Sequence, residues 1–188
     1  MSWTTLVFEP EERIISKNTL VTTIPVLGKE WRVTFEVMMS IKYDLNHMLY
    51  HQVKPAHYTE AQYQNVLHLT IGGSHEQNGD RTPAVWIHPD KGVLFSSAVN
   101  GKSDYGFFCP KHLPQAGIWT LYEVSQVCKE EEHFFAISIN GEEVHSTMNK
   151  RPEAFANVGV FASNPWDANP HRPASLRNLK IESEVSGT

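Results

Sequence analysis

The sequence has little cysteine and no long apolar run. Its 188 residues include only Cys109 and Cys128, and neither belongs to a Cys-x-x-Cys pair. Two cysteines form neither a disulfide framework nor a zinc motif, and these two either pair once or stay free. No stretch of about 18 apolar residues is present, which excludes a membrane-spanning helix. A hydrophobic core must therefore stabilise the chain without help from disulfides.

Positive charge is scarce as well. Lys and Arg total 16 against 21 Asp and Glu, which gives a net charge of −5, and no basic run stands out. This balance excludes nucleic acid as a partner. The segment Met1–Thr5 also lacks the basic region and apolar run of a signal peptide. We expect an extracellular location as a mature chain, with an intracellular location as the alternative.

What the sequence has in abundance is strand patterning. From Trp31 to Val37, apolar residues alternate strictly with polar ones, and Val66 to Ile71 repeats the pattern before Gly72-Gly73. Strands are also expected over residues 83–88, 93–99, 119–127, 134–139, 158–162 and 179–181. Asn100-Gly101 and Asn140-Gly141 are strong hairpin turns, because both residues tolerate positive φ.

These strands predict an all-β fold, an antiparallel sandwich that forms a single domain. No helical period is longer than two turns, although residues 58–64 have the pattern of a short capped helix. Three connections are longer than a hairpin needs, at residues 41–64, 74–82 and 163–174. Long loops on a rigid sandwich often carry function.

Several segments resemble laminin-G-like domains of the concanavalin A-like jelly-roll superfamily. The resemblance covers residues 6–183, and within the superfamily the sequence is most similar to poorly characterised animal members. It is carried by Gly28-Lys29-Glu30-Trp31, Phe35-Glu36-Val37, Val66–Gly73, Gly79–His88, Ser97–Gly101, Trp119-Thr120, Ala162–Trp166 and Leu176–Leu179. It implies an antiparallel jelly-roll sandwich. The superfamily includes lectins, pentraxins, glycoside hydrolases and protein-binding laminin-G modules, so function must be argued from a site.

The hydrolase branch has no support in the carboxylates. Jelly-roll glucanases place two carboxylates on one strand, about 5–5.5 Å apart, for a retaining mechanism. Here Glu123 stands alone in its strand. Glu130, Glu131 and Glu132 are consecutive and are expected in a solvated hairpin loop. No nucleophile-elbow motif is present either.

A calcium site is the second possibility that the resemblance implies. Such domains often bind Ca²⁺ through Asp and Asn oxygens in loops at one sheet edge, and Ca²⁺ takes 6–8 oxygen ligands. The candidate metal ligands are Asp80, Asn164 and Asp167, with Asn78 and Asn169 nearby in sequence. The alternatives are structural: Asp80 caps a turn or pairs with an arginine, and Asp167 belongs to a packed loop stiffened by two prolines.

Sugar binding is the third possibility, because glycans stack on aromatic rings while polar side chains hydrogen-bond their hydroxyls. Trp86 and His88 share one face of their strand, opposite Val85 and Ile87. We expect this face, His68 with Thr70, and Arg32 with Thr34 and Glu36 to line one concave groove. The alternatives are that Trp86 is core and that His68 is a satisfied sheet residue. The candidate ligand-binding residues are Asp80, Arg81, Trp86, His88, Asn100 and Trp166.

The early loop is a separate candidate for contact with a partner. Tyr and His residues are concentrated there, at positions 43, 47, 50, 51, 57, 58 and 63. Such a composition suits an adaptable contact surface, and the alternative is a lid packed over the sheet edge.

The sequence thus favours a non-catalytic, lectin-like module that binds a glycan or another extracellular ligand. One alternative is a laminin-G-type module that binds proteins. Another is an enzyme that uses His and Asp residues of the concave face. Open strand edges would allow a homodimer to form by edge pairing.

Overall fold

The computed structural model describes residues 2–40, 63–88, 92–112, 114–166 and 174–184. Within these ranges the chain forms thirteen strands and no helix. No helix long and apolar enough to cross a membrane is therefore found in the described part of the chain. The early loop and the helix predicted at 58–64 lie outside the described residues, apart from Tyr63 and Gln64, and Gln64 begins a strand.

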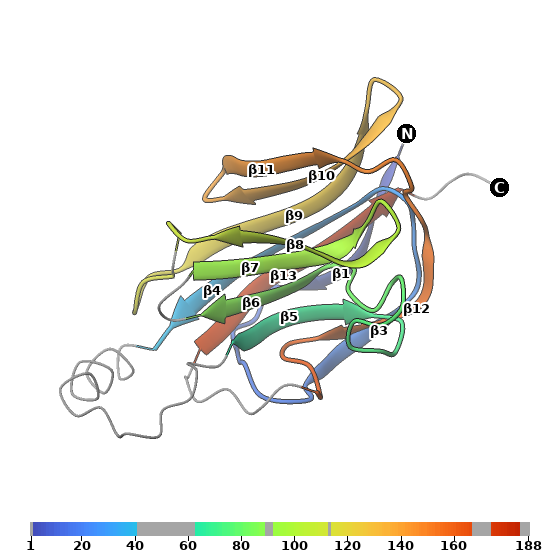
Figure 1. The fold of residues 1–188 in the computed structure, drawn as a ribbon. Coiled ribbons are helices and arrows are strands. Elements are labelled where there is room, and N and C mark those ends of the chain that lie inside the picture. The colour runs from blue at the N-terminus through green and yellow to red at the C-terminus, as the bar shows by residue number, and fades with distance from the viewer. Residues whose placement is uncertain (1, 41–62, 89–91, 113, 167–173, 185–188) are drawn as a thin grey trace, which may run out of the picture.

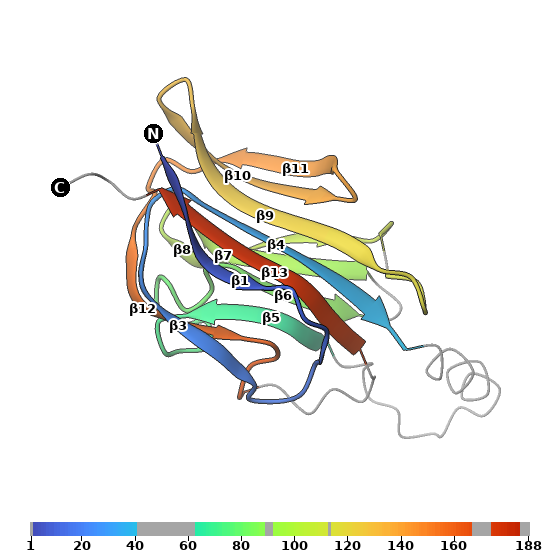
Figure 2. The ribbon, with the colours of Figure 1, turned by 180° about the vertical axis from the view of Figure 1, so that it is seen from behind.

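The strands form two antiparallel sheets that face each other (Figures 1 and 2). Sheet A has the order β1 (Trp3–Glu9), β13 (Ala174–Glu184), β4 (Trp31–Met39), β9 (Thr120–Lys129), β10 (Glu132–Ile139) and β11 (Glu142–Met148), with the short β2 (Arg13–Ile14) on β13. Sheet B has the order β3 (Leu20–Leu27), β12 (Phe155–Phe161), β5 (Gln64–Thr70), β6 (Ala84–His88), β7 (Gly92–Val99) and β8 (Lys102–Cys109). The prediction of an all-β, antiparallel sandwich is confirmed.

The core lies between the sheets and is built by the alternation read from the sequence. Trp31, Val33, Phe35 and Val37 of β4 are fully buried. The Phe35 ring stacks on Tyr122 of β9, with 5.5 Å between their centroids. Burying such side chains contributes roughly 1.5–3 kcal/mol each, so β4 is a central element of the core.

The two Asn-Gly turns also form as predicted. Asn100 and Gly101 have φ values of 55° and 76°, and Asn140 and Gly141 have 51° and 83°. These backbone conformations join β7 to β8 and β10 to β11. Both cysteines are free, Cys109 in the core and Cys128 partly buried.

One part of the predicted groove is wrong. Arg32 and Glu36 lie on β4 in sheet A, whereas His68 and Trp86 lie on sheet B. Because each strand buries its other face in the core, the two polar faces point to opposite sides of the sandwich. On sheet A, Arg32 instead pairs with Glu123 at 3.3 Å.

Glu36 is likewise occupied on the outer face of sheet A. Its carboxylate accepts hydrogen bonds from Arg177 and Asn178 of β13. Burial by itself raises the pKa of Glu36, but these two hydrogen bonds and the positive charge of Arg177 together outweigh it and hold the pKa below its usual value. Arg32 and Glu36 of this face are thus each paired with an opposite charge.

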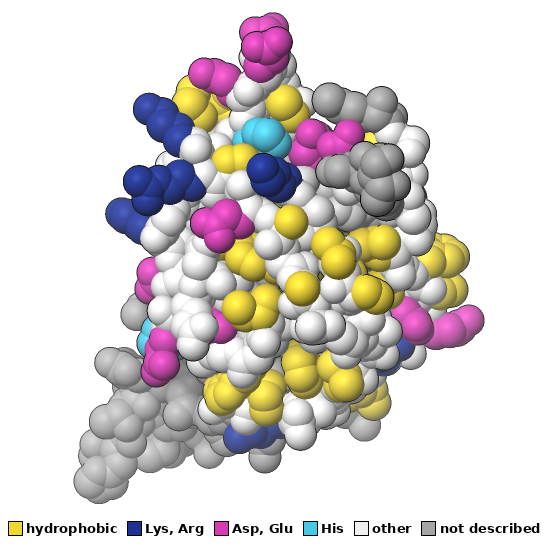
Figure 3. Space-filling view, turned by 90° about the vertical axis from the view of Figure 1, so that its right-hand side faces the viewer, with side chains coloured by type: hydrophobic (Ala, Val, Ile, Leu, Met, Phe, Trp, Pro, Cys, Tyr) yellow, Lys and Arg dark blue, Asp and Glu magenta, His cyan; other side chains and the backbone are white. Residues whose placement is uncertain are grey.

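The outer surface carries no basic face on the side seen in Figure 3. There, hydrophobic side chains are scattered over the middle, Lys and Arg lie mainly toward the upper left with others at the lower edge, and acidic side chains lie at the top, along the left side and at the right edge.

The edge strands of the two sheets are joined by His145 of β11. Its ring stacks on Phe107 of β8 with 4.1 Å between centroids, and its Nε2 atom lies 3.0 Å from the hydroxyl of Tyr105. Burial lowers the pKa of His145, and the nearby Glu143 carboxylate opposes this only in part. The folded state therefore favours the neutral ring.

This arrangement predicts a pH dependence of stability. As the pH falls below about 6.5, the unfolded chain takes up a proton at position 145 before the folded chain does, so stability is lost. We expect the melting temperature to fall less steeply over this range in His145→Phe, which keeps a ring on Phe107 but cannot be protonated. The exposed His75 supplies the control, and His75→Gln should keep the slope of the wild type. An equally steep fall in His145→Phe would contradict the assignment.

Candidate functional site

The candidate site lies on the outer face of sheet B, where the chain turns sharply after β12. Ser163 has a φ of 78°, a left-handed conformation. The carbonyl groups of Ser163 and Asn164 accept hydrogen bonds from the backbone N–H groups of Thr19 and Asn18, at 3.3 and 3.2 Å. The segment after β12 is thereby fixed to the start of β3.

Asn164 is fully buried and holds this corner onto β5. Its backbone N–H donates to Oδ1 of Asn65 at 3.1 Å. Its side-chain Oδ1 accepts the backbone N–H of Trp166 at 3.0 Å. Its Nδ2 lies 3.1 Å from Nδ1 of His68. One amide side chain thus sets the position of Trp166 relative to β5.

The hydrogen bonds of His68 define its protonation state. Its Nε2 lies 2.7 Å from the carbonyl oxygen of Asp80, which can only accept, so Nε2 carries the proton. Its Nδ1 faces the Asn164 amide nitrogen, which only donates, so Nδ1 is unprotonated. The orientation of that amide is fixed in turn by its bond to Trp166. His68 is therefore a neutral, fully buried link between two loops.

Aromatic side chains pack around His68 in a continuous row. The His68 ring lies 5.6 Å from Trp86 on β6 and 5.4 Å from Trp166, and Trp166 lies 6.5 Å from Phe161 of β12. The Arg81 guanidinium lies over the Trp86 ring at 4.6 Å. Trp86 is 5% exposed, whereas Trp166 is 40% exposed. Trp166 is therefore the member of the row with the most open ring.

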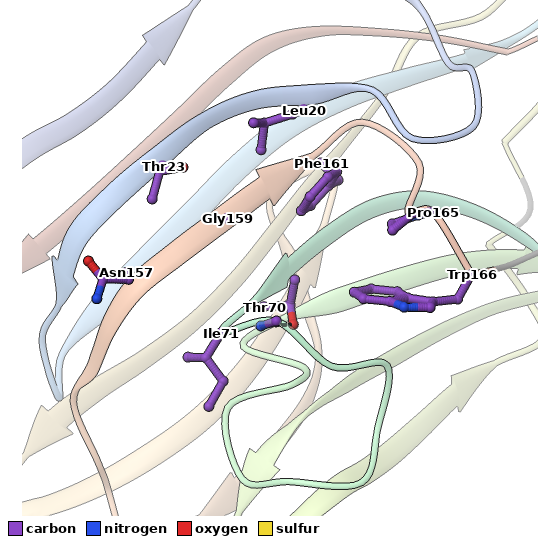
Figure 4. A pocket seen from close by; sticks show the side chains of 10 residues that line it. Leu20, Thr23, Thr70, Ile71, Asn157, Gly159, Phe161, Pro165 and Trp166 are labelled. Atoms are coloured by element: carbon purple, nitrogen blue, oxygen red, sulfur yellow. Dashed lines mark hydrogen bonds between the residues drawn. The ribbon is translucent and has the colours of Figure 1, made fainter.

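A shallow pocket of about 340 Å³ opens beside Trp166 (Figure 4). β12 supplies the floor, because Val158 and Val160 point into the core and leave Asn157, Gly159 and Phe161 on the outer face. A Cβ atom on Gly159 would lie 2.9 Å from the Phe161 ring, so only glycine leaves this floor open. The other lining residues are Leu20, Thr23, Thr70, Ile71, Gly72, Pro165 and Trp166. The pocket thus combines aromatic surface with hydroxyl and amide groups.

Asp80 organises the loop beside this pocket. Its carboxylate accepts the backbone N–H groups of Gly73 at 3.1 Å and Gln77 at 2.7 Å, and the residue is 2% exposed. Gly73 is required there for space, since its Cβ would lie within the Asp80 carboxylate. Arg81 follows, and its Nε donates to the Ser74 carbonyl at 3.1 Å. The Asp80 carboxylate thus caps the turn of its own loop, as the structural alternative for this residue predicted.

The structure brings together only some of the predicted site residues. Asp80, Arg81, Trp86, Asn164 and Trp166 all belong to the network around His68.

Two other predicted ligand-binding residues have their own partners. His88 lies further along β6, edge-on to Tyr63 at 4.8 Å. Asn100 is directed to another region, where its side chain hydrogen-bonds the backbone of Met148 and Lys150. Asp167 lies outside the described residues.

Sequence reasoning did not select Phe161, Asn157 or Gly159. A signal was available, because in a strand over residues 158–162 Val158 and Val160 alternate with Gly159 and Phe161, which puts the last two on the opposite face. Asn157 lies before that predicted strand. Leu20 and Thr23 were missed because β3 itself was not predicted.

Comparisons with known proteins show the fold of this chain. No protein-family model matches it, and no curated protein matches it in sequence.

Solved structures match it in shape. The CBM40 domain of the Ruminococcus gnavus IT-sialidase, bound to α2,3-sialyllactose, is 12% identical with a TM-score of 0.58, and the match covers 98% of this chain and 95% of that one. The botulinum neurotoxin serotype D ligand-binding domain in complex with N-acetylneuraminic acid is 11% identical with a TM-score of 0.53, covering 98% and 39%. The binding domain of Paraclostridial Mosquitocidal Protein 1 is 7% identical with a TM-score of 0.56, covering 97% and 49%.

The match therefore spans less than half of the neurotoxin chain and of the mosquitocidal-protein chain. At these identities the likeness establishes the β-sandwich and no more. The resemblance to laminin-G-like domains holds at the level of this sandwich.

Proposed function

We propose that the protein is a non-catalytic carbohydrate-binding module that holds a glycan in the pocket beside Trp166. The observation that carries the proposal is the open Trp166 ring at the rim of a pocket that also contains the exposed side chains of Thr23 and Asn157. The apolar face of a sugar stacks on such a ring, while hydroxyl and amide side chains bond the sugar hydroxyls. Two similar sandwiches are solved with a sialic acid or a sialylated sugar bound, which supports this class of ligand.

The chemistry of the lining supports binding rather than hydrolysis. Glycoside hydrolysis requires two carboxyl groups beside the scissile bond. The described residues that line the pocket include no carboxylate and no histidine. His68 lies beneath the Trp166 ring with both nitrogens hydrogen-bonded. It therefore acts on the site through the position of Trp166.

The test is a glycan array followed by affinity measurements with Trp166→Ala. Covering an aromatic ring of this size with a bound sugar contributes roughly 1.5–3 kcal/mol to the binding free energy. Trp166→Ala removes that contribution, so we expect affinity to fall about 10–100-fold. Trp3 of β1 offers a matched control, since it is 38% exposed on sheet A with Arg32 over its ring at 5.3 Å. Trp3→Ala should leave glycan affinity unchanged. Equal affinity losses in both variants, or no glycan bound by the wild type, would overturn the proposal.

The calcium ion, the extracellular location and the homodimer stay predictions. Asp80 and Asn164 carry oxygen atoms that already accept backbone N–H groups of their own loops, and Asp167 lies outside the described residues. A Ca²⁺ ion held there would bind beside the Trp166 corner and would stabilise it. A Ca²⁺-dependent rise in melting temperature is the measurement that decides this, as argued below for Asp80.

A further inference from the structure

A second cluster of side chains lies in sheet A, away from the strands that form the pocket. It consists of Glu30, directly before β4, with Cys128 of β9 and His133 of β10. A carboxylate oxygen, the thiol sulfur and a ring nitrogen all lie within 4.8 Å of one another. Three different donor types therefore converge on one point.

Strand pairing fixes two of the three donors. Cys128 and His133 are directly opposite each other in the β9–β10 ladder, next to the turn at Glu130 and Glu131. Both turn residues have positive φ, 52° and 67°. Opposed residues in an antiparallel pair put their side chains on the same face, with Cβ atoms about 4.5–5.5 Å apart. This is the inward face, because Phe135, two residues beyond His133, is core.

Glu30 is held by contacts on both its backbone and its side chain. Its carbonyl oxygen accepts the Ser183 hydroxyl at 2.8 Å and the Glu184 N–H at 3.0 Å. Its Oε2 accepts the Cys128 N–H at 3.0 Å, whereas its Oε1 lies 4.0 Å from Nε2 of His133, beyond hydrogen-bond reach. The residue is more than nine-tenths buried. A carboxylate oxygen is thus directed at an imidazole and a thiol without a hydrogen bond to either.

We propose that Glu30, Cys128 and His133 bind a zinc ion. Thiolate, imidazole and carboxylate together are a donor set that suits Zn²⁺, whereas Ca²⁺ and Mg²⁺ select oxygen ligands alone. Zn²⁺ needs its ligands about 2.0–2.3 Å away, so the three donors must close by roughly 1 Å from their present spacing. Binding displaces the thiol proton of Cys128 to solvent. The fourth position of the tetrahedral zinc coordination is filled by a water molecule or by Glu184, whose carboxyl group contacts Glu30.

Such an ion would link the β9–β10 hairpin to the start of β4. The three ligands come from chain segments about 100 residues apart, so the ion closes a long loop of the unfolded chain. The site is independent of the proposed glycan site, which lies on β3, β12 and β5 of sheet B. Its role is therefore structural.

The experiment is a titration of the reduced, metal-free protein with Co²⁺, followed by displacement with Zn²⁺. A thiolate bound to Co²⁺ gives a charge-transfer band in the near ultraviolet, which we expect in the wild type and which Zn²⁺ should abolish. Cys128→Ser should remove the band. Cys109→Ser is the matched control, since Cys109 is the other free thiol and lies on β8, and it should keep the band.

Two more variants separate ligand loss from misfolding. Glu30→Gln keeps an oxygen for the Cys128 N–H but removes the negative charge, and His133→Gln removes the imidazole from a partly exposed position. Each should weaken Zn²⁺ affinity at least ~10-fold, as metal-site changes typically do. Zn²⁺ at about 100 times its dissociation constant should raise the wild-type melting temperature by roughly 5–10 °C. A wild type with no band, or a band that persists in Cys128→Ser, would overturn the proposal.

Discussion

Asp80→Ala is expected to lower the melting temperature by roughly 5–15 °C in the presence of EDTA. The substitution removes the carboxylate that accepts two backbone N–H groups, those of Gly73 and Gln77. Charge-assisted hydrogen bonds of this kind, and the groups left unsatisfied without them, are worth about 2–4 kcal/mol together. The effect extends further, because the Asp80 carbonyl also holds Nε2 of His68. A thermal melt with a van't Hoff analysis measures the loss.

Two controls make this result specific to the loop. Asp104→Ala removes an exposed carboxylate of β8 and should change stability by less than about 0.5 kcal/mol. Asp80→Asn keeps one oxygen acceptor and should cost less than Asp80→Ala. A fall in Asp80→Ala no larger than in Asp104→Ala would contradict the loop-organising role.

The same variant decides the calcium prediction. If Asp80 is a Ca²⁺ ligand, the wild type melts at a higher temperature in Ca²⁺ than in EDTA, and Asp80→Ala loses that difference. A difference that survives in Asp80→Ala removes Asp80 from the ligand set. Equal melting temperatures of the wild type in Ca²⁺ and EDTA leave Asp80 with its structural role alone.

Strands buried on one face were predictable from the sequence, because their alternation is a local property. The β4 pattern from Trp31 to Val37 and the Asn140-Gly141 turn are both found as expected. Glu130 and Glu131 form the β9–β10 turn, as predicted, whereas Glu132 already begins β10. In each case the signal depends on neighbours within a few residues, so no tertiary information was needed.

Strands at sheet edges were not predictable in the same way. β3 and β8 are the two edges of sheet B, and neither was singled out from the sequence. β3 contains Pro25, and β8 contains Asp104 and Gly106, residues that are depleted in strand interiors. An edge strand tolerates them because it pairs on one side only. Their positions are decided by the neighbouring strand rather than by their own pattern.

The site shows the same division between local and long-range information. Trp166, Asn164 and Trp86 were selected by residue type, but their partners depend on pairing across the fold. Asn164 reaches His68, which precedes it by 96 residues. The mistaken grouping of Arg32 with His68 has the same cause, since polar alternation shows that a face is outward but not which sheet carries it. The proposed zinc site lies between these two cases. Once the two-residue turn at Glu130 and Glu131 is known, counting residues back along both strands places Cys128 opposite His133, but the position of Glu30 depends on the fold.

Asn164→Ala is expected to weaken both stability and glycan binding although the residue is fully buried. The substitution leaves Nδ1 of His68 without the Asn164 donor and the Trp166 N–H without its acceptor, at a cost of about 2–4 kcal/mol. Trp166 then loses the contact that sets its position beside the pocket. We therefore expect a loss of affinity close to the roughly 10–100-fold loss of Trp166→Ala. Thermal melts and glycan affinities on the same samples measure the two effects.

Asn149 provides the matched control for this prediction, because it is another buried asparagine with a full set of hydrogen bonds. Its side chain bonds Gln126 at 2.6 Å and the Asn100 N–H at 2.9 Å, away from the pocket. Asn149→Ala should cost similar stability and leave glycan affinity unchanged. Because Asn164 and His68 act on the same Trp166, Asn164→Ala and His68→Ala should be non-additive in binding, with a coupling of about 0.5–3 kcal/mol. Additive losses would show that His68 supports the pocket by a route other than Asn164, and unchanged affinity in Asn164→Ala would show that the corner does not position the binding ring.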